Sequence, residues 1–262
     1  MDARLRGLSV LFALAASACG AHGSTQTERE TMLTSGLRAG PLAVYTVRGD
    51  FLGAPDVETL RLSARGGVRD VERSLQDGSV VGAGVAIPDG ERFYAAFGPR
   101  ASSVMLAVYR RSDTAVVGLV AYGGRGLAGV ESWSAGGYGP DAFVGRFEVS
   151  GSDPSTGDAY EGTVEVRRDG DLYRVHWSLP AGDRDGVGFV DGEVLAVVAP
   201  DEVGVPSAGA RMGSGDRALG AYRSDGSTIL GSVLYLPDGG TPRQATERLD
   251  RADPRPPSAV RP

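Results

Sequence analysis

Short runs of alternating apolar and polar residues occur along most of the chain. In "EGTVEVRRDGDLYRVHWSL", residues 161–179, two alternating runs flank an Asp-Gly pair, and the second run places Tyr173, Val175 and Trp177 on one face. Alternation with a period of two predicts a strand that buries one face. Asp-Gly favours the type I′ turn, which joins two strands tightly. The segment is therefore predicted to be a β-hairpin.

The same pattern occurs twice, in a tandem repeat. Four pairs of segments align in the same order: 57–75 with 161–179, 82–99 with 186–200, 106–122 with 219–235, and 128–133 with 244–249. The last pair places Glu131 and Glu247 at equivalent positions. An additional loop at 201–216 is the main length difference. The chain therefore contains two related β units.

Each unit is predicted to contain sequential antiparallel strands. The first copy predicts strands near 42–48, 57–63, 67–75, 81–87, 91–98, 103–111, 114–122 and 127–133. The second predicts strands near 144–150, 160–167, 171–179, 185–190, 193–199, 217–223, 228–236 and 244–249. Asp-Gly pairs begin at Asp77, Asp89, Asp169, Asp185, Asp191, Asp225 and Asp238. Sequential strands can protect their edges by closing into an up-and-down barrel.

The predicted fold class is therefore all-β, with two tandem eight-stranded antiparallel meanders that form small calycin-like barrels. Residues 41–135 are expected to form the first β domain and residues 141–250 the second. Two open, packed sheets are the alternative architecture. In the second copy the inward positions are Phe147, Val149, Tyr160, Val164, Val166, Tyr173, Val175 and Trp177.

The N-terminus has the features of an export signal. Arg4 and Arg6 precede an apolar run at 8–18, which is about half the length of a membrane-spanning helix. "ASAC" ends at Cys19, the chain's one cysteine, and resembles a bacterial lipobox. That resemblance implies a signal peptide at 1–18 and a lipid, including palmitate, on Cys19. An ordinary secretory signal is the alternative.

The remaining terminal segments and the net charge indicate the expected location and partners of the protein. Residues 19–40 read as a polar tether, and residues 251–262 as a proline-rich disordered tail. Gly20 after the cysteine favours the outer membrane over the inner membrane. The net charge of −6 opposes nucleic acid as a partner. The expected partners are the membrane, through lipidated Cys19, and an unknown protein or other envelope component.

The second copy resembles a family of small, poorly characterised exported bacterial domains. The shared pattern includes Y-x-G-x-V, here at 160–164, and Y-x-V-x-W, here at 173–177, and the match covers most of 145–249. The first copy departs from it, with Arg73 where the second copy has Trp177. Some members carry the label "fibronectin-binding". The resemblance implies a lipoprotein with tandem β-meander domains and brings no catalytic motif.

Candidate catalytic groups are few. His176 lies on the strand face opposite Trp177 and is read as a solvent-facing residue, and His22 lies in the tether. Neither stands in a sequence context typical of a catalytic triad. No metal site and no cofactor are expected, because ligand residues at suitable spacings are missing from the sequence. Glu131 and Glu247 are read as structural carboxylates that bond an arginine or backbone amides.

Tyr160, Tyr173 and Trp177 are the candidate ligand-lining residues, if the second barrel is hollow. Three functions follow from these features. The first is a non-catalytic envelope lipoprotein that presents two β domains to a surface or macromolecular partner. The second is a carrier or sensor of a small apolar ligand in the second barrel. The third is a hydrolase acting on envelope polymers.

Overall fold

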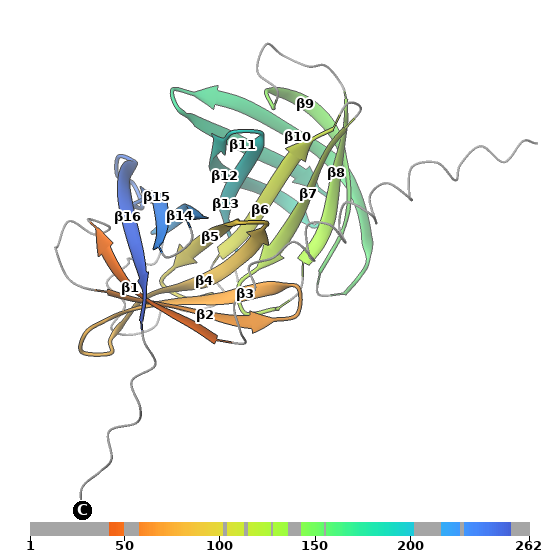
Figure 1. Ribbon diagram of the computed structural model, residues 1–262. Helices are drawn as coiled ribbons and strands as arrows, with labels where there is room; N and C mark the ends of the chain where they lie inside the picture. Colours follow the sequence, from red (N-terminus) through yellow and green to blue (C-terminus); the bar gives the residue numbers. More distant parts are fainter. Residues whose placement is uncertain are drawn as a thin grey trace, which may run out of the picture.

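The computed structural model describes residues 42–49, 58–101, 104–112, 115–126, 128–135, 143–154, 156–201, 216–225 and 228–252. These residues form an all-β protein with two closed antiparallel barrels of eight strands each (Figure 1). The predicted fold class is confirmed. The predicted signal peptide, Cys19, the predicted tether and most of the predicted tail lie outside the described residues.

One barrel, here called barrel B, is continuous in sequence. Each strand pairs with the next along the chain, and β13 pairs with β6 to close the barrel. Its strands are β6 (Val104–Arg111), β7 (Ala115–Tyr122), β8 (Ala128–Ala135), β9 (Gly145–Ser152), β10 (Ala159–Asp169), β11 (Leu172–Leu179), β12 (Gly182–Asp191) and β13 (Val194–Pro200).

The other barrel, barrel A, is made from both ends of the described chain. β5 pairs with β14, and β1 pairs with β16, so barrel B is inserted between β5 and β14 (Figure 1). Its strands are β1 (Leu42–Gly49), β2 (Glu58–Arg65), β3 (Val68–Leu75), β4 (Val80–Asp89), β5 (Arg92–Gly98), β14 (Arg217–Ser224), β15 (Thr228–Leu236) and β16 (Arg243–Arg251).

The two barrels therefore do not coincide with the two repeats. The expectation that 41–135 and 141–250 each form a separate domain is wrong, because each repeat gives five strands to one barrel and three to the other. The physical reason is that β6 and β14 are repeat-equivalent strands. Leu195 of β13 lies opposite Tyr109 of β6, and Phe93 of β5 lies opposite Tyr222 of β14. Either closure buries the same kinds of side chain.

Several of the described Asp-Gly pairs lie at hairpin turns as predicted, but these turns are not type I′, because no described non-glycine residue has a positive φ. Gly90, Gly170 and Gly192 have φ values of 63°, 65° and 65°, which a glycine adopts without strain. Gly186, by contrast, lies inside β12. A Cβ at Gly186 would approach Trp177 Cζ3 to 2.9 Å, so glycine makes room there for the indole ring.

Apolar side chains fill three clusters. One lies inside each barrel, and the predicted inward residues of the second copy all belong to the cluster of barrel B or pack against it. The third lies between the barrels and contains outward residues of both, including Val85, Ile87, Leu106, Leu119 and Leu219. The barrels therefore share a continuous apolar interface.

Candidate functional site

An ion cluster occupies the interior of barrel A. The Arg73 guanidinium, which has no exposed side-chain surface, donates to Glu58 Oε2 at 2.6 Å and to Glu247 Oε1 at 2.8 Å. The Tyr222 hydroxyl donates to Glu247 Oε2 at 3.0 Å. Burial by itself would lower the pKa of Arg73, but Glu247, Tyr222 and Glu58 outweigh it and raise that pKa. Arg73 is therefore held as a cation between two carboxylates.

Barrel B satisfies its buried glutamate with neutral donors. Glu131 Oε1 accepts hydrogen bonds from the Tyr109 hydroxyl at 2.6 Å and from the indole nitrogens of Trp133 and Trp177 at 2.7 and 3.0 Å. Glu131 Oε2 accepts from the Tyr160 hydroxyl at 2.6 Å. Both oxygens of this carboxylate are therefore hydrogen-bonded, Oε1 by three donors and Oε2 by one. Burial, then Glu131, raises the pKa of Tyr109 well above its ordinary value.

These contacts show where the predicted ligand-lining residues and the two repeat-equivalent glutamates lie. Tyr160 and Trp177 bond to Glu131 in the centre of barrel B, while Tyr173 is buried at the barrel end and borders the groove described below. Glu131 and Glu247 lie in different barrels and do not meet. Of the two, Glu247 bonds an arginine, and Glu131 bonds aromatic donors instead.

His176 lies on the outer face of β11, beside Ser178 and Asp185. Its Nδ1 is 2.8 Å from Asp185 Oδ1, and its Nε2 is 3.3 Å from Ser178 Oγ. The order of groups is that of a serine hydrolase triad. The Asp185 side chain is 86% exposed, however, and none of these residues lines the groove described below. A nucleophile needs donors for the oxyanion in a site that excludes water, so the arrangement is best read as a surface polar network.

Among the described residues, no group of three or more histidine, cysteine, aspartate or glutamate side chains is placed to hold a metal ion. In those residues there is also no helix that is long and apolar enough to cross a membrane.

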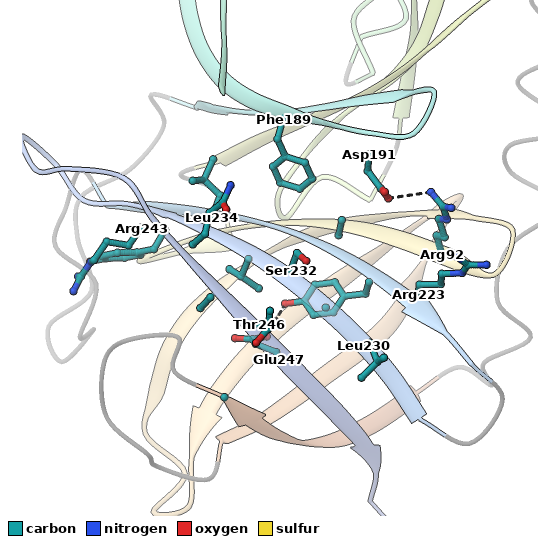
Figure 2. A pocket seen from close by; sticks show the side chains of 18 of the residues that line it. Arg92, Phe189, Asp191, Arg223, Leu230, Ser232, Leu234, Arg243, Thr246 and Glu247 are labelled. Atoms are coloured by element: carbon teal, nitrogen blue, oxygen red, sulfur yellow. Dashed lines mark hydrogen bonds and ion pairs between the residues drawn. The ribbon is translucent and has the colours of Figure 1, made fainter. Parts of the chain in front are cut away.

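A groove of about 1660 Å³, here called the inter-barrel groove, is lined by residues of both barrels. Outward residues of β14, β15 and β16 form its floor, inward residues of the same strands, such as Tyr222, Val233 and Glu247, also contribute to its lining, and β12 of barrel B overhangs it. Figure 2 shows Phe189 above the floor residues Ser232 and Thr246, with Arg243 toward one end and Arg92 and Arg223 toward the other.

The groove exists because equivalent faces of the two barrels are packed differently. On β7, the outward residues Val117, Leu119 and Ala121 are buried, at 7%, 1% and 0% exposure. Their equivalents on β15 are Leu230, which is 53% exposed, Ser232, which is also exposed, and Leu234, which is buried in the interface cluster. One face is covered by the neighbouring barrel and the other is partly open.

The overhanging strands show the same difference. Ile87 of β4 is 1% exposed and belongs to the interface cluster, whereas its equivalent Phe189 on β12 is only partly buried. On the floor, Gln244 and Thr246 of β16 are exposed where the equivalent β8 residues, Ala128 and Val130, are apolar. Polar substitution in one copy therefore coincides with the open side.

Ion pairs fix the two hairpin tips that border this region. Asp89, at the β4–β5 tip, pairs with Arg110 of β6. Asp191, at the β12–β13 tip, accepts from Arg92 at 3.0 Å and from the Tyr94 hydroxyl at 3.2 Å. Burial, then Asp191, raises the pKa of Tyr94. Each barrel is thus fastened to the other through a carboxylate on a turn.

Reasoning from the sequence missed the inter-barrel groove. Its floor residues point outward, and an outward polar residue is ordinarily read as solvent-facing. The available signal was the aligned repeat itself, because Leu119 is matched by Ser232 and Ala128 by Gln244.

No family model, curated protein or solved structure matches the chain.

Proposed function

We propose that this chain is a non-catalytic lipoprotein of the bacterial cell envelope that binds a surface or macromolecular partner in the inter-barrel groove. The observation that carries the proposal is the groove itself. Of two equivalent outer faces, one is apolar and covered, and the other is more polar and partly open. The lipobox-like "ASAC" sequence supports anchoring through Cys19, with the outer membrane as the favoured location.

The arrangement of the barrels suits a binding role. Both interiors contain large buried side chains engaged with each other, such as Trp133, Trp177 and Phe147 in barrel B and Phe93 and Tyr222 in barrel A. The shared apolar interface holds the walls of the groove in place. A groove with fixed walls loses little conformational freedom when a partner binds.

The carrier alternative receives less support. Tyr160 and Trp177 would line its cavity, but their polar atoms are already bonded to Glu131, Trp177 belongs to the apolar cluster of barrel B, and Tyr160 packs against that cluster. The hydrolase alternative rests on the exposed His176 network, which lacks an enclosing site among the described residues.

Photo-crosslinking in the native bacterium tests the proposal. A photoreactive amino acid replaces Thr246 on the groove floor, and a matched variant carries it at exposed Glu148 on β9, outside the groove. We expect a discrete adduct from Thr246 that is absent from Glu148 and is lost when Ser232→Trp fills the groove. Identical adducts from both positions, or none from Thr246, would contradict groove binding.

The anchor is tested separately, by metabolic labelling with an alkynyl fatty acid. We expect label on the wild-type chain and none on Cys19→Ala, with the variant moving from the membrane fraction to the soluble fraction. Label that persists in Cys19→Ala would show that the lipid, if any, is attached elsewhere.

A further inference from the structure

We infer that the inter-barrel groove recognises an acidic peptide segment of a partner protein, with the carboxylates of the segment at the arginines and its aliphatic side chains on the groove's apolar residues. This inference rests on the proposed function and names the chemistry of the partner.

The first support is the charge of the groove lining. It contains six arginines, Arg48, Arg92, Arg168, Arg223, Arg243 and Arg248, and three carboxylates, Asp171, Asp191 and Glu247. Glu247 is already bonded to Arg73 inside barrel A. The groove is therefore locally basic on a chain whose net charge is −6, and this contrast favours an anionic partner.

The second support is that two of these arginines have donors to spare. Among the described residues, the side chains of Arg223 and Arg243 make no hydrogen bond or ion pair, although Arg243 lies 5.1 Å from the Tyr235 ring centroid. Figure 2 shows Arg223 and Arg243 toward opposite ends of the groove. A guanidinium can bind a carboxylate through two parallel hydrogen bonds.

The aligned repeat explains why Arg223 lacks a partner. Its equivalent in the first copy is Arg110, which pairs with Asp89. The equivalent of Asp89 is Asp191, but Asp191 pairs with Arg92. In the second copy, the position equivalent to Arg92 is occupied by Val194. Arg92 therefore leaves Arg223 available at the rim of the groove.

The third support is the mixture of apolar and hydroxyl groups between these arginines. Leu230 is 53% exposed, Phe189 is partly buried, and Ser232 and Thr246 lie on the floor between them. Aliphatic side chains of a peptide would cover Leu230, and a polysaccharide has none to offer. The volume of about 1660 Å³ exceeds the usual range of small-molecule sites, which favours a chain segment over a small anion.

Peptide selection on the purified full-length chain tests the inference. Random dodecapeptides displayed on phage are selected, and the best are resynthesised with a fluorophore for anisotropy titration. We expect enrichment of aspartate and glutamate together with aliphatic residues. Arg223→Gln and Arg243→Gln should each weaken binding roughly fivefold, and Arg61→Gln on β2, outside the groove, should not. Added salt should also weaken binding.

Three results would overturn the inference: selected peptides without acidic enrichment, equal weakening by Arg61→Gln, and polygalacturonate binding that matches or exceeds the best peptide. The last result would assign the groove to acidic polysaccharides. Failure of the acidic-peptide inference can be distinguished from failure of the proposed function. A cellular adduct at Thr246 that survives Arg223→Gln with Arg243→Gln would keep groove binding and reject acidic recognition.

Discussion

Barrel A and barrel B each bury one glutamate at a repeat-equivalent position, and they satisfy it in different ways. Glu247 bonds the cation Arg73, which also bonds a second carboxylate, Glu58. Glu131 bonds Trp177 instead, and the position equivalent to Glu58 is Gly162. The comparison shows that the buried carboxylate and one tyrosine that bonds it, Tyr109 or Tyr222, are common to both cores, whereas the remaining partners differ. An arginine in a barrel core needed an additional carboxylate, and a tryptophan did not.

The largest expected effect comes from removing the cation of barrel A. Arg73→Met leaves Glu58 and Glu247 facing each other without a charge partner, and we expect a loss of about 3–5 kcal/mol of unfolding free energy. Urea unfolding followed by circular dichroism measures it. Arg61→Met on the exposed face of β2 is the control, with an effect within about 0.5 kcal/mol. A loss below about 1 kcal/mol would show that the ion cluster is dispensable.

A transplant sharpens the same comparison. Arg73→Trp alone also leaves both carboxylates without a cation, but Arg73→Trp with Glu58→Gly reproduces the residues that barrel B has at these positions. We expect the double variant to recover roughly 1–3 kcal/mol relative to Arg73→Trp. No recovery would mean that the two positions are not coupled.

The second effect compares the covered and open faces. Leu119→Ser should cost about 2–4 kcal/mol, because it removes a side chain buried in the interface between barrels. The reverse change at the equivalent position, Ser232→Leu, should change stability by less than about 0.5 kcal/mol. Both are measured by urea unfolding. Equal costs would mean that the groove is closed in solution.

The third effect concerns the neutral core. Glu131→Gln directs an amide NH₂ group at donors that need an acceptor, and we expect a loss of about 1–3 kcal/mol. The chain contains two tryptophans, and both donate to Glu131. Tryptophan emission therefore reports on barrel B specifically and should shift in this variant. An unchanged emission spectrum with unchanged stability would contradict the assigned hydrogen bonds.

A further effect appears at alkaline pH. Burial and then Glu131 raise the pKa of Tyr109 and Tyr160, and burial and then Glu247 raise that of Tyr222. Unfolded tyrosines ionise near about pH 10. Their stabilising contribution is thus complete below that pH and is lost as pH rises toward the folded pKa, because the unfolded state then holds fewer protons.

Each such tyrosine should add about 1.4 kcal/mol of lost stability per pH unit above about pH 10. Barrel B contributes two of these three residues and barrel A one. Urea unfolding between about pH 9 and about pH 11 measures the slope. Tyr160→Phe and Tyr222→Phe should each reduce this slope by about 1.4 kcal/mol per pH unit. An unchanged slope in either variant would contradict the burial argument.

The strands of this molecule were predictable because period-two alternation and Asp-Gly turns are local signals. The exchange of strands between the two repeats was not predictable. "LAVYR" at 106–110 and "LGAYR" at 219–223 bury the same face with similar residues. Alternation shows which side of a strand is buried, and it cannot show which of two similar strands lies beside β5.

The candidate site was predictable only in part, for a related reason. Alignment of the repeat identified Glu131 and Glu247, and the inward face of β11 identified Trp177 as a neighbour of the core. Tyr109, which bonds Glu131, lies on a strand of the first repeat, whereas Trp177 lies on a strand of the second. The inter-barrel groove depends on outward residues of β12 and β15, and their proximity follows from the exchange.

The insertion of barrel B also sets an order of assembly. All strands of barrel B lie between residues 104 and 200, so this barrel can close as soon as that stretch is available. β1 has to wait for β16, with Tyr45 opposite Arg251, so barrel A closes over nearly the whole length of the chain. Until then, β1 and β5 are exposed strand edges of the kind that aggregate. We expect folding of this protein to depend on protection of those edges until its last three strands are available.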